Sequence, residues 1–404
     1  MGKVVAIISE YNPFHKGHEY QIKCIRRDFG DDTTVIAIMS GNYTQRADVS
    51  FADKLTRATA AVESGVNLVL ELPFPYSCSS AEFFARSGVA IANDLGIVDY
   101  ISFGSELGDV DELQTIAKNM MSREFKSALA DAQKNAEYET LGHPALTEKI
   151  YCSLFGDIDQ RITSPNNTLA LEYLKAIAEL KSDIKPHTVK RSGADYNKLT
   201  LEANEFPSAS AIREAYKRGD ASAFEYMADS AKPVFYDAHV SHQIPCDVER
   251  LSAAVISHLR LNPIPDKKIH DAEGGLYNRL ARLSFETDSI TSLTALAQTK
   301  KYTTARIRRA TLFSFIGVTS SDVKTLPRYT QVLAMDTIGA KALKSIKKTS
   351  AISIITKPST TKGLDDIALQ QKRLSDAADS VFQLTKPQTT HGAYHITFTP
   401  YVKK

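Results

Sequence analysis

The sequence predicts an α/β protein in two parts: a parallel sheet with helices on both faces over residues 1–230, then a mainly helical, basic part over residues 231–404. Three observations support this division. Short, continuous apolar runs alternate with helix-like segments in the first half, a pattern typical of buried parallel strands. A chain of 404 residues exceeds what a single core usually holds. The sign of the net charge changes between the two halves.

Local patterns in the first half predict alternating strands and helices. Strands are expected at 4–8, 34–39, 66–73, 100–103 and, as an edge strand, 185–191. Helices are expected at 19–29, 51–64, 80–93, most of 109–160, 168–180 and from 207 onward. In the segment 51–64, the apolar residues share one face and Lys54 and Arg57 lie on another. Ligands of parallel sheets bind outside the carboxyl ends of the strands, so the loops that hold His15, Gln45 and Gly104 should converge on one cleft.

The second half is expected to consist mainly of helices. Residues 231–245 resemble a linker, helices are expected at 251–261, 276–283 and 303–316, and residues 355–364 are expected to form a loop. His239, His242 and Cys246 have loose spacing and no fourth partner, so they do not predict a metal site. A group of lysines at 341–348 is equally consistent with a binding surface and with a solvated helix.

The charge difference between the halves suggests two roles. Residues 1–230 contain 24 Lys and Arg against 33 Asp and Glu, a balance of −9, whereas residues 231–404 contain 25 against 14, a balance of +11. A basic surface of this size favours a polyanionic partner such as a nucleic acid. The alternative is that each half is simply solvated.

The N-terminal motif Ser9-Glu-Tyr-Asn-Pro-Phe-His-Lys-Gly-His18 follows the first predicted strand and precedes a helix. His15 and His18 can donate to phosphate oxygens, and the start of the helix adds unpaired N–H groups. Gly17 lets a base or phosphate approach the backbone. This arrangement favours attack on the α-phosphate of a nucleotide, with the histidines stabilising the developing charge. A lone histidine is more often structural, but the complete motif in this position is rare.

Three later segments are predicted to reach the same cleft. Asn166 and Asn167 precede a helix, where a helix cap is the alternative explanation. The edge strand ends in Lys190 and Arg191, which bring two cations to the rim. Ser208-Ala-Ser-Ala-Ile-Arg213 opens a helix and suits a bound anion, although a simple capping motif has a similar sequence.

Composition narrows the class of protein. Apolar residues make up 43% and charged residues 24%, as in ordinary globular proteins. No apolar run approaches the roughly 20 residues that span a bilayer, and no signal peptide or myristoylation pattern is recognised. Four scattered cysteines indicate neither disulfides nor a zinc site. We therefore expect a cytoplasmic protein with no membrane partner.

Two of these motifs, Asn-Pro-Phe-His-x-Gly-His and Ser-Ala-Ser-Ala-Ile-Arg, resemble those of the HxGH nucleotidyltransferase superfamily, which implies a Rossmann-like fold that binds ATP. Further runs extend the resemblance to the tRNA(Met) cytidine acetate ligase family: Met39-Ser-Gly-Asn42, Gln45-Arg46, Leu70-Glu-Leu-Pro73, Phe103-Gly-Ser-Glu106 and Pro165-Asn-Asn167. Glu273–Leu280 and Lys301–Arg309 are similar to the tRNA-binding half of that family. Residues 331–404 match no part of it.

The resemblance, together with the rim cations, implies a set of site residues. His15 and His18 would be catalytic. ATP contacts are expected at Ile7, Ile8, Ser9, Glu10, Tyr11, Asn12, Pro13, Phe14, His15, Lys16, Gly17, His18, Glu19, Tyr20, Gly104, Asn166, Asn167, Lys190, Arg191, Ser210 and Arg213. tRNA contacts are expected at Lys301, Arg306, Arg308 and Arg309. No metal ligands of the protein are predicted, but Mg²⁺ is expected to accompany the ATP phosphates.

The implied reaction has two steps: acetate and ATP form acetyl-adenylate, and the wobble cytidine of elongator tRNA(Met) then takes the acetyl group. Two alternatives stay open. An adenylyltransferase that passes AMP to a small nicotinamide- or pantetheine-type phosphate ester would explain the first half but leave the basic half without a role. A non-catalytic RNA-binding protein would not need intact His15, Gly17 and His18.

Overall fold

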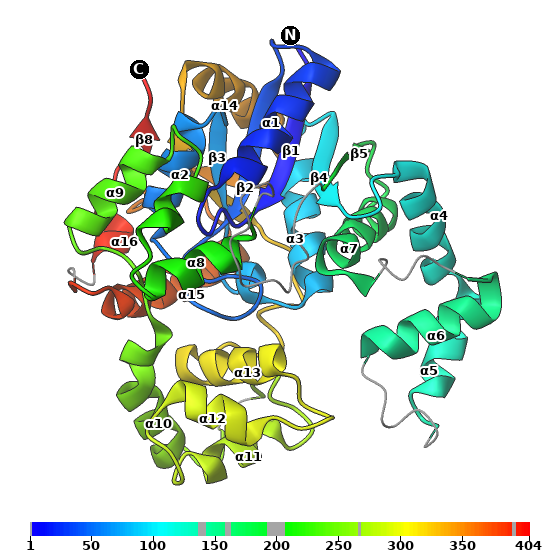
Figure 1. Ribbon diagram of the computed structural model, residues 1–404, viewed down its shortest axis with the longest axis vertical. Coiled ribbons are helices and arrows are strands. Elements are labelled where there is room, and N and C mark those ends of the chain that lie inside the picture. Colours follow the sequence, from blue (N-terminus) through cyan, green and yellow to red (C-terminus); the bar gives the residue numbers. More distant parts are fainter. Residues whose placement is uncertain (1, 136–142, 158–162, 192–206, 266–267, 390–392) are drawn as a thin grey trace.

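The computed structural model describes residues 2–135, 143–157, 163–191, 207–265, 268–389 and 393–404. These residues form an α/β fold around one mixed, mostly parallel sheet (Figure 1). The strands are β1 Val4–Ser9, β2 Thr34–Ser40, β3 Leu68–Leu72, β4 Tyr100–Ser105, β5 Lys185–Lys190, β6 Tyr329–Met335, β7 Ser353–Ile355 and β8 Tyr401–Val402. The predicted fold class is confirmed.

Helices precede, connect and follow these strands. The first half contains α1 Lys16–Phe29, α2 Lys54–Glu63, η1 Tyr76–Cys78, α3 Ala81–Asp94, α4 Val110–Met121, α5 Arg123–Ala132, α6 His143–Phe155, α7 Pro165–Glu179, α8 Ala209–Lys217 and η4 Ala221–Tyr226. The second half contains α9 Lys232–Val240, η5 Val248–Leu251, α10 Ser252–Leu261, α11 Leu276–Leu283, α12 Ile290–Ala297, α13 Thr304–Ile316, α14 Thr337–Thr349, α15 Asp366–Phe382, η6 Gln383–Thr385 and α16 Tyr394–Thr397. No helix in these described ranges is both long and apolar enough to cross a membrane.

The sheet has the strand order β5-β4-β1-β2-β3-β6-β7, with β8 also paired to β6. Strands β5, β4, β1, β2 and β3 run parallel, so their carboxyl ends share one edge. Alternate residues of β1 face opposite layers: Ala6 and Ile8 pack with α3 and α7, while Val5 and Ile7 pack with α1 and α2. Burial on both faces explains why these strands have continuous apolar sequences.

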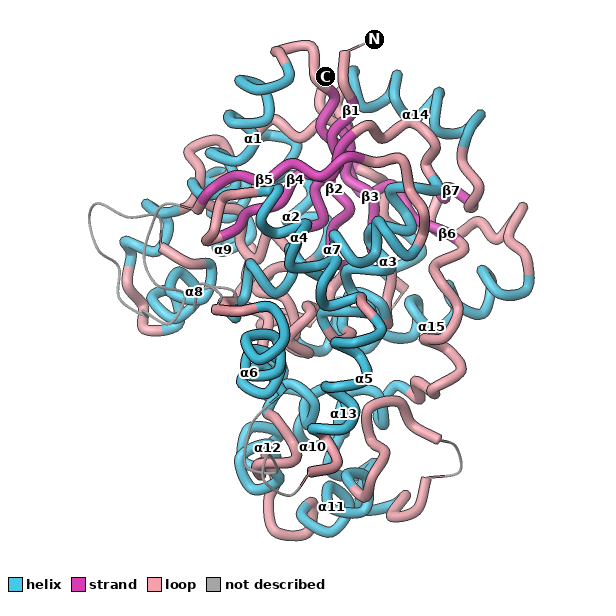
Figure 2. Tube along the Cα trace, turned by 90° about the vertical axis from the view of Figure 1, so that its right-hand side faces the viewer, coloured by secondary structure: helices cyan, strands magenta, loops and turns pink. Residues whose placement is uncertain are grey.

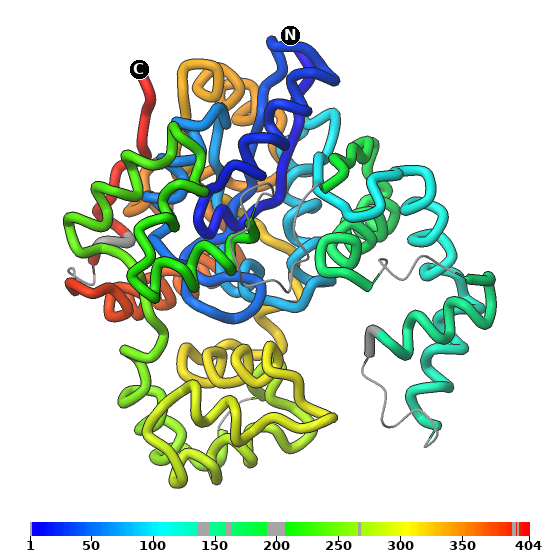
Figure 3. The backbone as a smooth tube through the Cα atoms, in the orientation of Figure 1, coloured from blue at the N-terminus to red at the C-terminus, as the bar shows by residue number. Residues whose placement is uncertain are grey.

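The C-terminal part of the chain returns to the sheet. Strand β6 pairs antiparallel with β3, and Leu68 lies opposite Met335. Figures 2 and 3 show this return, with the C-terminal strand β8 close to the N-terminal half of the molecule. Tyr401 donates to a Glu63 carboxylate oxygen at 2.5 Å, which fixes β8 against α2. The predicted division at residue 230 therefore does not separate sheet from helices, because three strands come from residues 329–402.

Buried ion pairs reinforce this return. Lys54 Nζ lies 2.8 Å from Glu71 and 2.5 Å from Asp379 on α15. Lys386 Nζ lies 2.7 Å from Asp53. All five side chains are almost fully buried. Lys54 and Arg57, which were expected on a different face of α2 from its apolar residues, are buried as well, because C-terminal elements and neighbouring loops cover them.

Helices α10 to α13 form a unit below the sheet in Figure 1. Its core, which includes Leu259, Leu280 and Leu293, continues into Phe74 beyond β3 and Phe382 on α15. The linker predicted at residues 231–245 is wrong, because residues 232–240 form helix α9, whose Phe235 and Ala238 pack in the core beside α2. Apolar residues at positions 235 and 238 have helical spacing, but the adjacent prolines obscured it.

Candidate active site

The two histidines of the motif lie at the carboxyl edge of β1, where helix α1 begins. His15 is the N-cap residue, and its Nδ1 accepts a hydrogen bond from Gly17 N–H at 3.0 Å. His18 Nδ1 accepts from His15 N–H at 3.2 Å, which completes a reciprocal capping box. The two rings stack with centroids 3.8 Å apart. The motif therefore forms the start of the helix and at the same time pairs the imidazoles.

These hydrogen bonds determine which ring nitrogen carries the proton. A backbone N–H can only donate, so Nδ1 of each neutral histidine must hold a lone pair and Nε2 must carry the hydrogen. Each ring therefore has an Nε2–H group left to donate elsewhere. Two parallel donors beside a helix N-terminus suit the oxygens of a phosphate.

Both histidines are held in the neutral form. Burial, together with the charges of Arg191 and Arg213, lowers the pKa of His15 to about 3. Burial, followed by His15 and Arg191, holds the pKa of His18 well below its usual value. The site therefore offers neutral N–H donors near two permanent cations.

Helix α8 brings Arg213 to the motif. Arg213 Nη1 donates to the Asn12 carbonyl oxygen at 2.6 Å, and Nη2 donates to Ser210 Oγ at 3.1 Å. Ser208 is the N-cap residue of α8, and its Oγ accepts from Ala211 N–H at 3.2 Å. The capping explanation therefore holds for Ser208, while Ser210 and Arg213 lie together at the motif.

Arg191 follows the last residue of β5 and lies beside the start of α7. Its Nη1 lies 3.5 Å from Asn166 Oδ1, and its aliphatic chain passes over Gly104. A Cβ atom at Gly104 would lie 3.3 Å from Arg191 Cγ, so glycine gives the arginine room to cross the strand end. The neighbouring Lys190 is exposed and packs along Gly108.

The two asparagines at the start of α7 differ sharply. Asn167 is fully buried, and its Oδ1 accepts the N–H groups of Glu106 at 3.0 Å and Leu107 at 3.3 Å. Asn166 is half-buried, donates to Glu106 Oε1 at 2.6 Å and meets Arg191. Asn167 therefore holds the loop after β4, and Asn166 is the one placed beside a cation of the site.

Other residues of the motif build the walls of the site. Ile7, Tyr11 and Phe14 are buried in the core, and the Tyr11 ring packs edge-on against His18 at 4.9 Å. Three of the predicted ATP contacts lie outside this core. Lys16 is half-buried, Glu19 pairs with Lys23 at 3.1 Å on α1, and Tyr20 is 37% exposed. Of the remaining predicted contacts, Ile8, Ser9, Asn12 and Pro13 are buried, while Glu10 and Gly17 are half-buried.

Two supporting residues were not predicted from the sequence. Arg57 is fully buried and donates to the carbonyl oxygens of Glu10, Ser40, Gly41 and Ala52, so it joins the loops that follow β1 and β2. Burial lowers the pKa of Arg57 to about 10, which leaves it charged at neutral pH. Glu106 links Asn166 and Asn167 through its two carboxylate oxygens. The polar residues Arg57 and Glu106 carried no periodic pattern that distinguished them from surface residues.

The four cations predicted to bind tRNA lie on or just before α13. Arg309 is buried and donates to Asp271, while Arg306 donates to the carbonyl oxygens of Asp271 and Glu273 at 3.1 and 3.0 Å. Lys301 is exposed and lies 3.2 Å from the Gly274 carbonyl oxygen. Arg308 is half-exposed and lies 3.6 Å from Asp48. Arg306 and Arg309 therefore hold the loop before α11 in place.

The chain is similar to known proteins over most of its length. The model of the HIGH Nucleotidyl Transferase family matches residues 2–395. The chain belongs to this family. Within it, a tRNA(Met) cytidine acetate ligase of Thermoanaerobacter sp. (strain X514) is 36% identical over 364 residues, covering 89% of this chain and 90% of the relative. The same enzyme of Clostridium perfringens (strain ATCC 13124) is 34% identical over 374 residues, with coverage of 89% and 90%.

Solved structures show the same likeness. Thermotoga maritima TmcAL without ligand has a TM-score of 0.90 and 27% identity, with 99% of each chain covered. The same protein bound to alpha-thio ATP has a TM-score of 0.88 and 26% identity, with 100% of each chain covered. The predicted resemblance to the tRNA(Met) cytidine acetate ligase family is confirmed. The residues after 330, which the motifs left unplaced, are part of the family fold.

Proposed function

We propose that this HIGH nucleotidyl transferase is an ATP-dependent ligase that acetylates the wobble cytidine of elongator tRNA(Met). The observation that carries the proposal is the stacked pair of neutral imidazoles, His15 and His18, with the charges of Arg191 and Arg213 acting on them. This arrangement supports binding of a polyphosphate rather than acid–base chemistry. The tRNA and acetate come from the names of the relatives and from the motifs shared with them.

In the first step, an acetate oxygen attacks the α-phosphorus of ATP, and the bond from that phosphorus to the bridging oxygen of pyrophosphate breaks. A carboxylate is already nucleophilic, so the step needs positioning and charge stabilisation and no general base. The Nε2–H groups of His15 and His18 would donate to the phosphoryl oxygens. Arg191 and Arg213 would attract the negative charge of the triphosphate.

In the second step, the exocyclic amine of cytidine attacks the acetyl carbonyl carbon. The bond between that carbon and the AMP oxygen breaks, the amine loses one proton, and AMP leaves. The cytidine must swing out of the anticodon loop to reach the adenylate. The exposed cation Lys301 and the half-exposed cation Arg308 are proposed to contact the RNA, with Arg306 and Arg309 shaping the surface between them.

Mg²⁺ is expected to reach the site with ATP. In the part of the chain that the structure describes, no three His, Cys, Asp or Glu residues gather as a metal site. The ATP phosphates would therefore supply the ligands of the ion, as is common in ATP enzymes.

One experiment tests the function. Pyrophosphate–ATP exchange is measured with acetate, with nicotinamide mononucleotide and with neither, and tRNA nucleosides are then analysed by mass spectrometry. We expect exchange only with acetate and N4-acetylcytidine only with tRNA present. In the same assay, His18→Ala should lower exchange by ~10²–10³-fold, the usual cost of losing a donor to transition-state charge. Pyrophosphate exchange with nicotinamide mononucleotide but not with acetate would contradict the proposed ligase and support an adenylyltransferase.

A further inference from the structure

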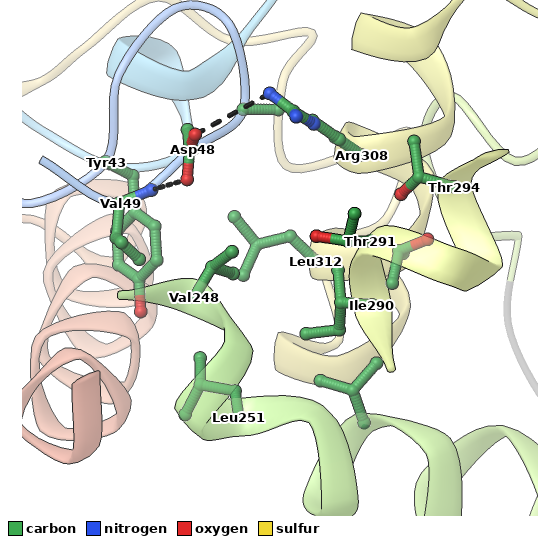
Figure 4. A pocket seen from close by; sticks show the side chains of 13 residues that line it. Tyr43, Asp48, Val49, Val248, Leu251, Ile290, Thr291, Thr294, Arg308 and Leu312 are labelled. Atoms are coloured by element: carbon green, nitrogen blue, oxygen red, sulfur yellow. Dashed lines mark hydrogen bonds and ion pairs between the residues drawn. The ribbon is translucent and has the colours of Figure 1, made fainter. Parts of the chain in front are cut away.

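The loop between β2 and α2 connects the active site to the helical unit. Gln45 N–H donates to Glu10 Oε1 at 2.7 Å, directly after β1, and Gln45 Nε2 lies 3.4 Å from the Ser79 carbonyl oxygen, beyond β3. Three residues later, Asp48 lies 3.6 Å from Arg308 on α13 (Figure 4). Residues 43–49, which we call the bridging loop, thus contact both the strand-end edge and the helical unit.

The base of the bridging loop is firmly held. Tyr43 is buried, donates from its hydroxyl to the Ala378 carbonyl oxygen at 2.8 Å, and pairs with Val49 in an isolated antiparallel bridge. Thr44 N–H donates to the Asp48 carbonyl oxygen at 2.9 Å, and Ala47 N–H donates to the Thr44 carbonyl oxygen at 2.9 Å. Ala47 occupies the left-handed region at φ 58°, which closes a tight turn. The tip therefore has little freedom to move.

Arg46 stands exposed at this tip. Consecutive Cα atoms are 3.8 Å apart, so the Cα of Arg46 lies within about 8 Å of the Cα atoms of both Gln45 and Asp48. Asp48 pairs with Arg308, and Arg46 is the cation within the bridging loop itself. The pocket between this loop and α10, α12 and α13 is mainly apolar, with Val49, Leu251 and Leu312 among its lining residues, and offers no second cation besides Arg308 (Figure 4).

We infer that Arg46 binds the RNA backbone next to the cytidine that enters the active site. The inference rests on the proposed function. An RNA that lies on the helical unit and delivers one base to His15 and His18 must pass the loop that joins the two. A rigidly held, exposed arginine at that point suits a phosphate, because its guanidinium can donate two parallel hydrogen bonds. Arg46 would thus add to the affinity for the RNA beside the reactive nucleotide without touching ATP.

The test compares Arg46→Ala with a matched control, Arg27→Ala. Arg27 is exposed, pairs only locally with Asp28 at 2.7 Å, and lies in the last turn of α1. At 1.5 Å per residue, that turn is about 15–20 Å from the histidines. The readouts are acetate-dependent pyrophosphate exchange, the KM and kcat of acetylation with an elongator tRNA(Met) transcript, and direct binding of that transcript at several salt concentrations.

Arg46→Ala should leave exchange unchanged, raise the KM for the transcript about 10-fold with kcat nearly constant, and reduce the slope of log K against log salt by about 0.7, the value for one phosphate contact on a single strand. Arg46→Lys should recover the slope, and Arg27→Ala should change nothing. Unchanged transcript binding and slope in Arg46→Ala, or an equal change in Arg27→Ala, would overturn the inference. Failure of the proposed function would differ, since the wild-type protein would then lack acetate-dependent exchange.

Discussion

The neutral state of the two histidines has a measurable consequence for stability. His15 has a folded-state pKa of about 3, whereas an unfolded histidine has a pKa of about 6.5. Below pH 6.5 the unfolded chain therefore binds a proton that the folded chain excludes. The contribution of His15 to stability is fully present above that pH and is lost progressively as the pH falls toward 3.

His15→Asn isolates this effect. The asparagine Oδ1 can replace Nδ1 as acceptor from Gly17 N–H, and asparagine is a favoured N-cap residue, so the helix start should survive. Between pH 7.5 and 5.5, the wild-type protein should lose about 1.4 kcal/mol more of its free energy of unfolding than the variant. Urea unfolding at both pH values measures the difference. Equal losses would show that His15 does not resist protonation in the folded state.

Asn166 and Asn167 form a natural pair for comparison. Asn167→Ala leaves the N–H groups of Glu106 and Leu107 without their acceptor, which should cost about 1–3 kcal/mol of stability. Asn166→Ala removes a half-buried amide that donates to Glu106 and lies beside Arg191 but leaves no buried N–H group without its acceptor, so it should cost only about 1 kcal/mol. Asn166 is also an expected ATP contact, so its variant should raise the KM for ATP about 10-fold. Thermal unfolding measures the change in stability, and pyrophosphate exchange measures the KM for ATP. A loss of stability in Asn166→Ala with a raised KM in Asn167→Ala would mean that the two roles are assigned the wrong way round.

At the scale of elements, one buried cation joins α2, β3 and α15. Burial raises the pKa of Glu71 to about 7, although Lys54 opposes the rise. The charges of Glu71 and Asp379 are tolerated in the core because Lys54 lies between them and Asn42 donates to Asp379 at 2.7 Å. The ion pairs therefore specify where α15 docks.

Lys54→Met should lower the free energy of unfolding by about 3–5 kcal/mol, because two buried carboxylates lose their cation. Lys232→Met is the control. Lys232 pairs with Glu225 at 3.0 Å and Asp229 at 2.9 Å, but both carboxylates are mostly exposed, so its loss should cost less than about 1 kcal/mol. Equilibrium unfolding in urea gives both values. Similar losses in the two variants would mean that water reaches the Lys54 site.

Across the whole molecule, the features that could be predicted from sequence are those determined by near neighbours. The strands β1 to β4 are continuous apolar runs, and the His15–His18 motif carries its own capping hydrogen bonds. The missed features depend on distant partners. Lys54 meets Asp379 from 325 positions away, and β6 pairs with β3 although the two are separated by most of the chain. The residues next to Lys54 or β3 in the sequence give no sign of these distant partners.

The roles of cations were hard to predict for the same reason. Arg306 and Arg309 have the composition of an RNA-binding surface, yet both donate to the loop at residues 271–273. Similarly, Arg260 donates to the carbonyl oxygens of Ser284 and Thr287, and Arg279 donates to those of Leu296 and Ala297. Guanidinium groups thus tie the ends of neighbouring helices together, so the charge balance of +11 overstates the charge available to a partner.

The return of the C-terminal segment predicts how the chain can be divided. A fragment of residues 1–230 would expose the edge of β3 that β6 covers and would leave Lys54 without Asp379 and Asp53 without Lys386. An unpaired edge and uncompensated buried charges are both strongly unfavourable. We therefore expect this fragment to be unfolded or aggregated alone, and to fold when it is co-expressed with residues 231–404.

Size-exclusion chromatography and near-ultraviolet circular dichroism of the fragment, alone and co-expressed, measure the outcome. A folded monomeric fragment that exchanges pyrophosphate with acetate would show that the first 230 residues are a self-sufficient catalytic domain.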